Sequence, residues 1–300
     1  MVALRLPLKM RRWMKTTTAA VFVFILLTPW TVLAAEPSFV NLQERLIADG
    51  LDANLVQSIY NSFKVRLEPE VVAGNLVRSE ATLNYDQFLS TYSVRKAERY
   101  LDRHQSTLKE VEQRSGVPQE VVVAVLMVET ALGTYPGKYT TINMLSTMAA
   151  SKEPQIREQI LASLTEEQRQ MQSPRVISKR LTKRANRGYR ELKAFINYVQ
   201  KNDIDPFAVV GSSEGAIGIP QFLPSNIEYY GRDGDGDGRV DLLNHNDAIA
   251  SVANFLRAHR WGRAQGDKEK KKVILYYNRS NYYADTVFTL AQRLNGDKPL

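Results

Sequence analysis

The stretch GVPQEVVVAVLMVETALG (116–133) decides the fold. Pro118 suits the first turn of a helix, and the residues that follow, 121–129, are apolar on almost every side. A helix without a polar face is stable only when it is buried all round. The sequence therefore predicts a core helix, with Glu129 as the ionisable residue at its carboxyl end.

Glu129 is the first candidate for chemistry. Apolar neighbours and the negative end of the helix dipole both raise the pKa of a carboxyl group. A glutamate that stays protonated near neutral pH can serve as a general acid. The alternative is a partly buried glutamate held by an arginine or by backbone amides, and the helix alone does not choose between the two.

The rest of the chain also has helical punctuation. Leu55, Ile59 and Phe63 form one apolar stripe in 51–63, with Asp52 as a helix N-cap. Gly and Pro break up 211–226. The other predicted segments are one or two helices over 85–116, a periodic helix over 246–261, and a charged connector, GDKEKKK, over 266–272.

The N-terminus has the order of a secretory signal peptide. Five basic residues without an acid precede the apolar run AAVFVFILL (19–27), and small residues at Ala34 and Ala35 suit a cleavage site. An uncleaved anchor is the alternative, since 19–35 is almost long enough to span a bilayer. Cleavage near Ala35 predicts a periplasmic protein with no membrane segment, and the lack of cysteine excludes lipid attachment at that site.

Charge and cysteine usage narrow the function further. Removal of the signal peptide lowers the formal net charge from +8 to +3, so the basicity gives little support for nucleic acid as a partner. An exported chain without cysteine has no disulfides, so its stability must come from core packing, to which a bound ion can add. Basic residues recur at helical spacing over 175–193; a solvated helix face and contact with an anionic polymer both fit them.

The segment GRDGDGDGRVDLLN (231–244) resembles a calcium loop. Gly238 takes the sharp-turn position, but the final ligand position holds Asn244 in place of a bidentate glutamate. A sensor needs paired loops and that final glutamate, so a structural calcium site is the better prediction. Its predicted ligands are Asp233, Asp235, Asp237, Arg239 through its carbonyl, Asp241 and Asn244.

Several motifs in a fixed order resemble the family 3 lytic murein transglycosylases, the group around membrane-bound lytic transglycosylase B and its soluble relatives. They are ETALGTYPGKY (129–139), SSEGAIGIPQFLPS (212–225), the calcium-like loop, and YYNRSNYYADTVFTLAQRL (276–294). The resemblance implies a mainly α, lysozyme-like (α+β) fold. It implies three regions: a signal peptide (1–35), an added helical N-terminal region packing on the core (36–84), and a transglycosylase domain (85–300) that contains the calcium-like loop 233–244.

The resemblance also implies the site residues. Glu129 matches the sole catalytic acid/base, and no cofactor is implied for catalysis. The matched sugar contacts are Ser212, Gln221, Tyr277, Asn278 and Tyr283. Other readings stay open, because Gln221 could cap a helix and the tyrosines could be core residues. Many relatives carry arginine and tryptophan where this chain has Ala131 and Leu132.

The implied activity is cleavage of the MurNAc-GlcNAc bond of peptidoglycan strands with formation of a 1,6-anhydromuramic end. Cell-wall assembly proteins are further expected partners. A hydrolytic muramidase would need a second carboxylate about 5 to 9.5 Å from Glu129. A calcium-stabilised wall-binding protein without turnover is the third reading, although it has no need of a buried acid.

Overall fold

The computed structural model describes residues 39–78, 84–298 and 300. The predicted signal peptide, 1–35, lies outside them. The helices and strands in chain order are α1 (Val40–Ala48), α2 (Ala53–Tyr60), α3 (Pro69–Val77), η3 (Tyr85–Leu89), α4 (Thr91–Arg103), α5 (Gln105–Ser115), α6 (Gln119–Thr130), β1 (Tyr139–Thr140), α7 (Thr141–Ala150), α8 (Pro154–Ala162), α9 (Glu166–Met171), α10 (Pro174–Lys201), β2 (Val210–Gly211), α11 (Pro224–Tyr230), α12 (His245–Ala258), η4 (Trp261–Arg263), α13 (Gly266–Tyr277) and α14 (Asn281–Leu294).

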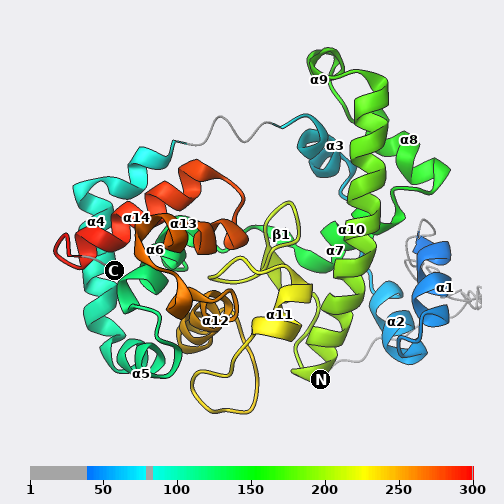
Figure 1. Cartoon of the computed structure of the whole chain (residues 1–300). Coiled ribbons are helices and arrows are strands. Elements are labelled where there is room, and N and C mark those ends of the chain that lie inside the picture. The colour runs from blue at the N-terminus through cyan, green and yellow to red at the C-terminus, as the bar shows by residue number, and fades with distance from the viewer. Residues whose placement is uncertain (1–38, 79–83, 299) are drawn as a thin grey trace, which may run out of the picture. The chain divides into compact units, whose positions relative to one another are not determined.

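The helix α6 is the predicted core helix. Residues 121–128 of this helix are all buried, each with at most 8% of its surface exposed. The helices α14, α4, α12 and α5 pack against it, and α14 makes the most extensive contact (Figure 1). The prediction of a helix buried on every side is confirmed, and Glu129, next to the carboxyl end of this helix, is partly buried.

A second helix pair is formed by α7 and α10. Every residue of α7 is buried, and the much longer, 28-residue α10 packs against it (Figure 1). Gly188 of α10 allows this approach, because a Cβ atom there would lie 2.5 Å from the Cβ of Met148. The close packing fixes α10 beside the segments that follow Glu129.

The two short strands connect these segments. β1 pairs with β2 in antiparallel register, Tyr139 opposite Gly211 and Thr140 opposite Val210. Bridges from Gly211 to Ile217 and from Ile217 to Phe222 continue the pairing into the Gly- and Pro-rich segment. The loop after Glu129 and the segment that contains Gln221 are therefore held side by side.

Two local predictions were wrong. Phe63 does not continue the apolar stripe of 51–63: α2 ends at Tyr60, Asn61 caps it, and Phe63 is 76% exposed while Val65 is buried in its place. The charged run 266–272 is not a connector but the first half of α13. Asp267 and Glu269 favour the start of this helix, and buried Val273 and Ile274 anchor it to the core.

The described part of the chain is mainly helical, as predicted. The helices α1 and α3 of the N-terminal region pack against α7, and α3 also contacts α8 and α10. The proposed boundary near residue 84 stays a prediction. Among the described helices, none has the length and apolar character that a membrane span requires.

Candidate active site

Glu129 stands one residue before the end of α6, where the backbone turns sharply. Ala131 and Leu132 both adopt left-handed conformations, with φ of 48° and 60°. The amide of Leu132 donates to the carbonyl of Leu126 at 3.0 Å, which closes the helix end. Non-glycine residues in this conformation cost free energy and cluster at functional sites. The turn leaves the Glu129 side chain partly accessible at the end of a buried helix.

The surroundings of the Glu129 carboxyl give it the properties of an acid that is poised near neutral pH. Burial raises its pKa from 4.5 to about 7. The hydroxyl of Tyr283 donates to Oε1 at 2.6 Å, which lowers the pKa and offsets part of the effect of burial. Both the protonated and the charged form are therefore populated near pH 7, so this group can give a proton and take one back.

Two tyrosines from α13 and α14 support this carboxyl. The rings of Tyr277 and Tyr283 stack with centroids 6.3 Å apart and planes 11° apart. Tyr277 donates its hydroxyl to the carbonyl of Pro220 at 2.5 Å. Tyr283 is only 2% exposed, so it is both a core residue and a direct partner of Glu129. The tyrosines thus join the acid to the segment that contains Gln221.

Gln221 adopts a left-handed φ of 50° directly after Pro220. Its side-chain amide donates to the carbonyls of Pro136 and Gly218, each at 2.9 Å. The following helix, α11, has Leu223 as its N-cap, so Gln221 does not cap it. Gln221 instead ties its own segment to the loop after Glu129.

Asn278 and Ser212 lie at turns. Asn278 ends α13, and its Oδ1 accepts from the amide of Ser280 at 3.1 Å; no hydrogen bond of its side-chain NH2 group occurs within the described chain. Ser212 Oγ accepts from the amides of Glu214 and Ala216, so it shapes the turn. Tyr283 bonds to Glu129 and stacks on Tyr277, and Tyr277 bonds to the residue before Gln221. Within the described chain no hydrogen bond joins Asn278 or Ser212 to Glu129.

Sequence reasoning missed two residues beside the acid. Thr130, buried next to Glu129, donates to the carbonyl of Ile219 at 2.8 Å and accepts from the amide of Gly133 at 2.9 Å. Lys96 of α4 donates to the carbonyl of Ala131 at 2.9 Å. Thr130 belongs to the quoted ET pair, which was a usable signal. Lys96 gave none, because its partner is a backbone atom of a distant segment.

Three acids in polar or turn-like sequence, Glu214, Asp203 and Asp205, have partners other than Glu129. Glu214 pairs with Arg184 at 2.7 Å and also with Arg187. Asp203 pairs with Arg239 at 3.3 Å, and Asp205 pairs with Lys64 at 3.8 Å. Burial and the Tyr283 hydrogen bond account for the pKa of Glu129, without a contribution from a described neighbouring carboxylate. The site therefore offers one carboxyl group.

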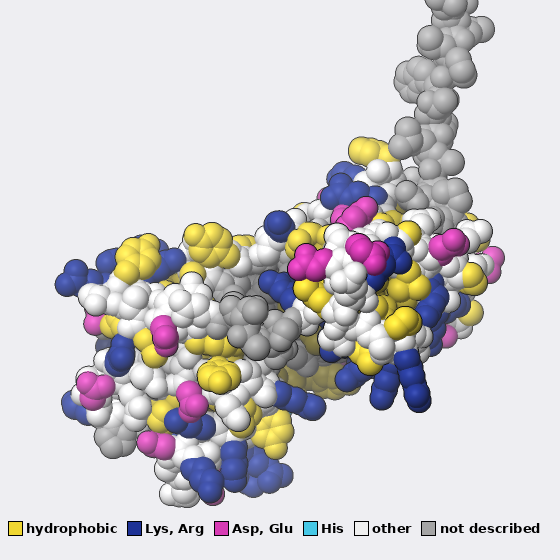
Figure 2. Space-filling model, turned by 90° about the horizontal axis from the view of Figure 1, so that it is seen from above, with side chains coloured by type: hydrophobic (Ala, Val, Ile, Leu, Met, Phe, Trp, Pro, Cys, Tyr) yellow, Lys and Arg dark blue, Asp and Glu magenta, His cyan; other side chains and the backbone are white. Residues whose placement is uncertain are grey.

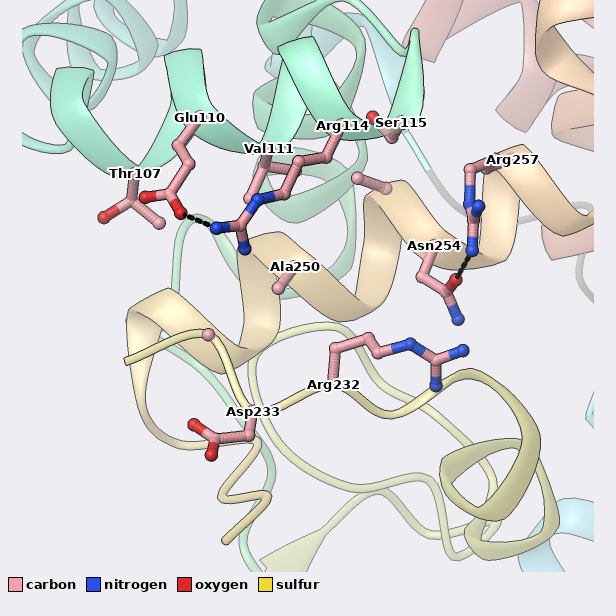
Figure 3. A pocket seen from close by; sticks show the side chains of 12 residues that line it. Thr107, Glu110, Val111, Arg114, Ser115, Arg232, Asp233, Ala250, Asn254 and Arg257 are labelled. Carbon is pink, nitrogen blue, oxygen red and sulfur yellow. Dashed lines mark hydrogen bonds and ion pairs between the residues drawn. The ribbon is translucent and has the colours of Figure 1, made fainter. Parts of the chain in front are cut away.

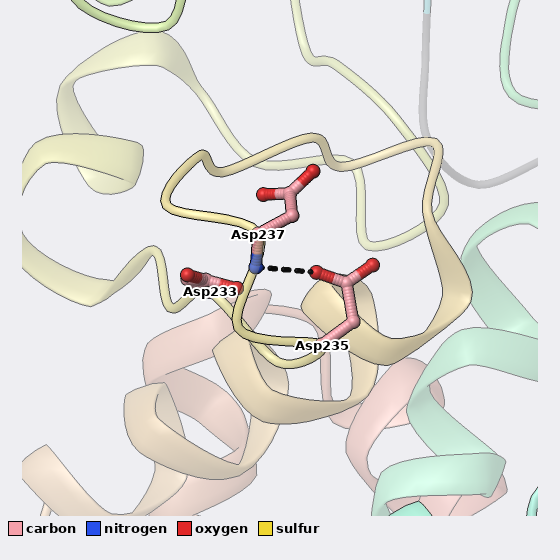
Figure 4. Close-up of side chains that lie close together, drawn as sticks. All are labelled: Asp233, Asp235 and Asp237. Atoms are coloured by element: carbon pink, nitrogen blue, oxygen red, sulfur yellow. Dashed lines mark hydrogen bonds between the residues drawn. The ribbon is translucent and has the colours of Figure 1, made fainter.

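The acidic loop brings three of its predicted ligands together. One carboxylate oxygen each of Asp233, Asp235 and Asp237 lies within 4.8 Å of the others (Figure 4). Asp233 also accepts from the amides of Gly236 and Gly238 at 2.6 and 2.8 Å, and these bonds lower its pKa. Clustered carboxylate oxygens on a tight loop suit a hard cation such as Ca²⁺.

The later part of the loop is organised differently. Asn244 donates its side-chain NH2 to Asp235 Oδ2 at 2.5 Å, and its Oδ1 accepts from the amide of Asn246 at the start of α12. Asp241 accepts from the amide of Leu243, and the side chain of Arg239 pairs with Asp203. These three stay predicted ligands outside the cluster.

Asp247 is a further loop residue that the sequence reasoning missed. It is 1% exposed, and its two oxygens accept from the amides of Gly234 and Asp241, each at 2.7 Å. These bonds tie both ends of the loop to α12. A cavity of about 220 Å³ lies between α5 and α12, with Arg232 and Asp233 at its edge (Figure 3). It is lined by charges of both signs and does not include Glu129.

This chain is similar in sequence and in fold to known lytic transglycosylases. Membrane-bound lytic murein transglycosylase B of Escherichia coli is 29% identical over 182 residues, which cover 61% of this chain and 42% of that protein. This chain thus matches less than half the length of that relative. SltB3 from Pseudomonas aeruginosa, solved in complex with NAG-anhNAM-pentapeptide, has 22% identity and a TM-score of 0.67 over 88% of this chain and 82% of that one.

Escherichia coli Slt35, solved in complex with calcium, has 22% identity and a TM-score of 0.68, with 87% of this chain and 93% of that one covered. These likenesses confirm the predicted fold class. The family model described as "Transglycosylase SLT domain" matches residues 34–271, most of the chain and all of the segment from α1 to Gln221. The chain therefore belongs to the transglycosylase SLT domain family, in agreement with the resemblance found in its motifs.

Proposed function

We propose that this protein is a lytic transglycosylase that cleaves the MurNAc-GlcNAc β-1,4 bond of peptidoglycan strands. One observation carries the proposal: among the described residues a single carboxyl group, Glu129, lies partly buried at the end of the core helix, where burial raises its pKa to about 7. An ordinary glycosidase divides acid and base or nucleophile between two carboxylates. A single carboxyl that changes protonation state suits a reaction in which the substrate supplies its own nucleophile.

Glu129 acts twice in this reaction. Its protonated carboxyl donates to the glycosidic oxygen, and the bond between that oxygen and C1 of the muramic acid breaks. The carboxylate then accepts the proton of the muramic acid C6 hydroxyl as its oxygen attacks C1. The products are a 1,6-anhydro ring and a free 4-hydroxyl on the leaving sugar, and no water is consumed.

Neighbouring groups stabilise the charged sugar in this scheme. Asn278 has a side-chain NH2 group without a hydrogen bond in the described chain, so this group can orient the N-acetyl group. Gln221 holds the two segments beside Glu129 together through Pro136 and Gly218. Ser212 shapes the next turn of the same wall. These roles are binding and positioning, and the proton transfers belong to Glu129.

Digestion of purified peptidoglycan by the protein without its signal peptide tests the proposal. Mass spectrometry of the released strands should find anhydromuramic ends. Reducing ends would identify a muramidase, and binding without release would identify a wall-binding protein. Neither alternative is favoured, because Glu129 has no described carboxylate partner and a binding protein has no use for a protonated buried acid.

The site of action in this proposal is the periplasm. The N-terminal basic and apolar pattern supports export, and the proposed substrate lies outside the cytoplasmic membrane. Cell-wall assembly proteins are proposed as further partners. Structural calcium is part of the same proposal, supported by the carboxylate cluster of Asp233, Asp235 and Asp237 and by the calcium complex of Slt35.

Calcium should stabilise the fold. Saturating Ca²⁺ after chelation is expected to raise Tm by about 5 °C, because a ligand that binds only the folded state adds its binding free energy to the stability. Calorimetric scans with and without Ca²⁺ measure the effect. The double variant Asp235→Asn/Asp237→Asn should lose the response, whereas Glu158→Gln, at an exposed acid of α8, should keep it. An equal Tm with and without Ca²⁺ would rule out the site.

Removal of the Tyr283 hydroxyl should shift the pH dependence. The hydrogen bond from Tyr283 lowers the pKa of Glu129, so Tyr283→Phe raises that pKa above about 7. Because the reaction begins with protonated Glu129, the alkaline limb of kcat/KM moves to higher pH, by about 1 unit for a charged hydrogen bond. Turnover of soluble glycan strands as a function of pH measures the shift.

The matched control is Tyr282→Phe, since Tyr282 is the neighbouring tyrosine and is 76% exposed. This variant should leave the alkaline midpoint where it is in the parent protein. A midpoint that stays in place or moves to lower pH in Tyr283→Phe would contradict the assigned role of the hydrogen bond.

A further inference from the structure

A cavity of about 550 Å³ lies along α10, and Glu129 is not among the residues that line it. Its charged lining consists of cations alone among the described residues: Arg78, Arg180, Lys183, Arg184, Arg187 and Arg190. Elsewhere, on the face seen in Figure 2, Lys and Arg side chains are spread in several groups with Asp and Glu between them. A concave surface of one sign of charge is therefore a distinct feature of this molecule.

The helix and its packing fix these side chains in place. Arg180, Arg184 and Arg187 follow one face of α10, and Arg180 donates to the carbonyl of Leu76 at 2.7 Å. Arg184 and Arg187 both pair with Glu214. Burial lowers the pKa of each guanidinium, and repulsion by Arg180 lowers that of Arg184 further, as repulsion by Arg184 does for Arg187. Arg78, Lys183 and Arg190 are exposed and have only Glu191, 3.7 Å from Arg190, as a described ion-pair partner.

The cavity adjoins the segment that carries the predicted sugar contacts. A neighbouring cavity shares Asn75 and Arg78 with it and is also lined by Tyr139 of β1 and by Ser213. Asn75 donates to the carbonyl of Ser213 at 2.9 Å. Glu214, the partner of Arg184 and Arg187, lies two residues after Ser212. The backbone amide of Glu214 donates to Ser212 Oγ. The cationic cavity therefore lies next to the turn that Ser212 shapes.

We propose that this cationic groove binds the carboxylates of the peptides that branch from the glycan strand, so that the preferred substrate is a strand that carries its stem peptides. The proposal rests on the proposed function. Guanidinium groups match carboxylates in geometry and charge, and a peptide attached to a bound muramic acid supplies such groups beside the strand. Because the groove lies beside the segment that holds Ser212, a predicted sugar contact, a peptide on a bound strand is a nearer source of carboxylates than a separate anionic polymer.

Binding of two fluorescently labelled strand preparations tests the groove. One preparation keeps its stem peptides, and the other has been stripped by an amidase that removes them. The parent protein should bind the peptide-bearing strands about tenfold more tightly, and the difference should shrink as salt rises. In Arg78→Gln/Lys183→Gln/Arg190→Gln the ratio of the two Kd values should fall to about one.

The matched control removes three other cations of the same helix. Arg175, Lys179 and Lys201 are exposed on α10 and do not line the cavity, so Arg175→Gln/Lys179→Gln/Lys201→Gln should keep the parent ratio. An equal loss of the ratio in both variants, or no preference in the parent protein, would overturn the assignment. Equally tight binding of a peptide-free phosphate polymer would replace it with a general polyanion surface.

The same preparations separate this inference from the proposed function. Release of anhydromuramic ends from stripped strands supports the transglycosylase activity whether or not the groove binds peptides. A parent ratio near one with normal release leaves the activity standing and removes the groove. A tenfold ratio without release supports the groove and removes the proposed activity.

Discussion

Replacement of Glu129 by glutamine should lower kcat for peptidoglycan cleavage by about a thousandfold. Glutamine keeps the size of the side chain and can still accept the hydrogen bond that Tyr283 donates at 2.6 Å. It carries no transferable proton, so neither protonation of the glycosidic oxygen nor deprotonation of the C6 hydroxyl takes place. Turnover of soluble glycan strands by mass spectrometry measures the loss.

The same variant should be no less stable than the parent protein. Burial raises the pKa of Glu129 from 4.5 to about 7 in the folded state, so folding favours its protonated form. The free energy that protonated Glu129 contributes to folding stability is fully present below pH 4.5 and is lost as pH rises through about 7. Glutamine stays neutral, so above pH 7 the Tm of Glu129→Gln should equal or exceed that of the parent.

A control on the same helix separates chemistry from charge. Glu120 lies in the first turn of α6, so Glu120→Gln removes one carboxyl from α6 without touching its far end. We expect Glu120→Gln to retain activity. Full activity in Glu129→Gln would contradict the assignment of the acid, and a large fall in its Tm would leave the activity loss explained by unfolding.

The substitution Gly137→Ala should destabilise the protein by roughly 3 kcal/mol or more. Gly137 adopts φ of +116°, and a Cβ atom there would lie 2.1 Å from the carbonyl carbon and oxygen of Gly211 in β2. Backbone atoms cannot move aside as a side chain can, so β1 and β2 would separate. The carbonyl of Pro136, which accepts from Gln221, would move with them.

Gly116 provides the comparison for this substitution. It also has a positive φ, +69°, but apart from its two chain neighbours no heavy atom of the described chain lies within 4 Å of the position of its Cβ. Gly116→Ala should therefore cost only about 1 kcal/mol, the strain of the left-handed conformation. Urea unfolding gives both values. Equal costs at the two positions would show that the contact between Gly137 and Gly211 is not as close as the structure has it.

Local sequence patterns predicted the core helix and its acid because both depend on short-range information. The apolar run 121–128 has no polar face, and Glu129 follows it directly. The prediction of a connector over 266–272 was wrong because this run, GDKEKKK, contains no apolar residues whose spacing would indicate a helix. The helix there is stabilised by Val273 and Ile274, which are buried against other elements.

Contacts between distant segments could not be predicted from the residues alone. Tyr283 reaches Glu129 only because α14 packs along α6, and the resemblance named Tyr283 as a sugar contact, not as the partner of the acid. Asp247 binds both ends of the acidic loop from outside the twelve-residue pattern. Glu214 lies in the Gly- and Pro-rich segment 211–226, and its partners Arg184 and Arg187 lie on α10, far away in the sequence.

In the proposed reaction one carboxyl group breaks the glycosidic bond and no water enters the product. Digestion of peptidoglycan in water labelled with heavy oxygen is the sharpest test of this reaction. New muramic ends should carry the anhydro ring and contain no heavy oxygen. Reducing muramic ends that carry one heavy oxygen at C1 would contradict it and would show that water, activated by another group, is the nucleophile.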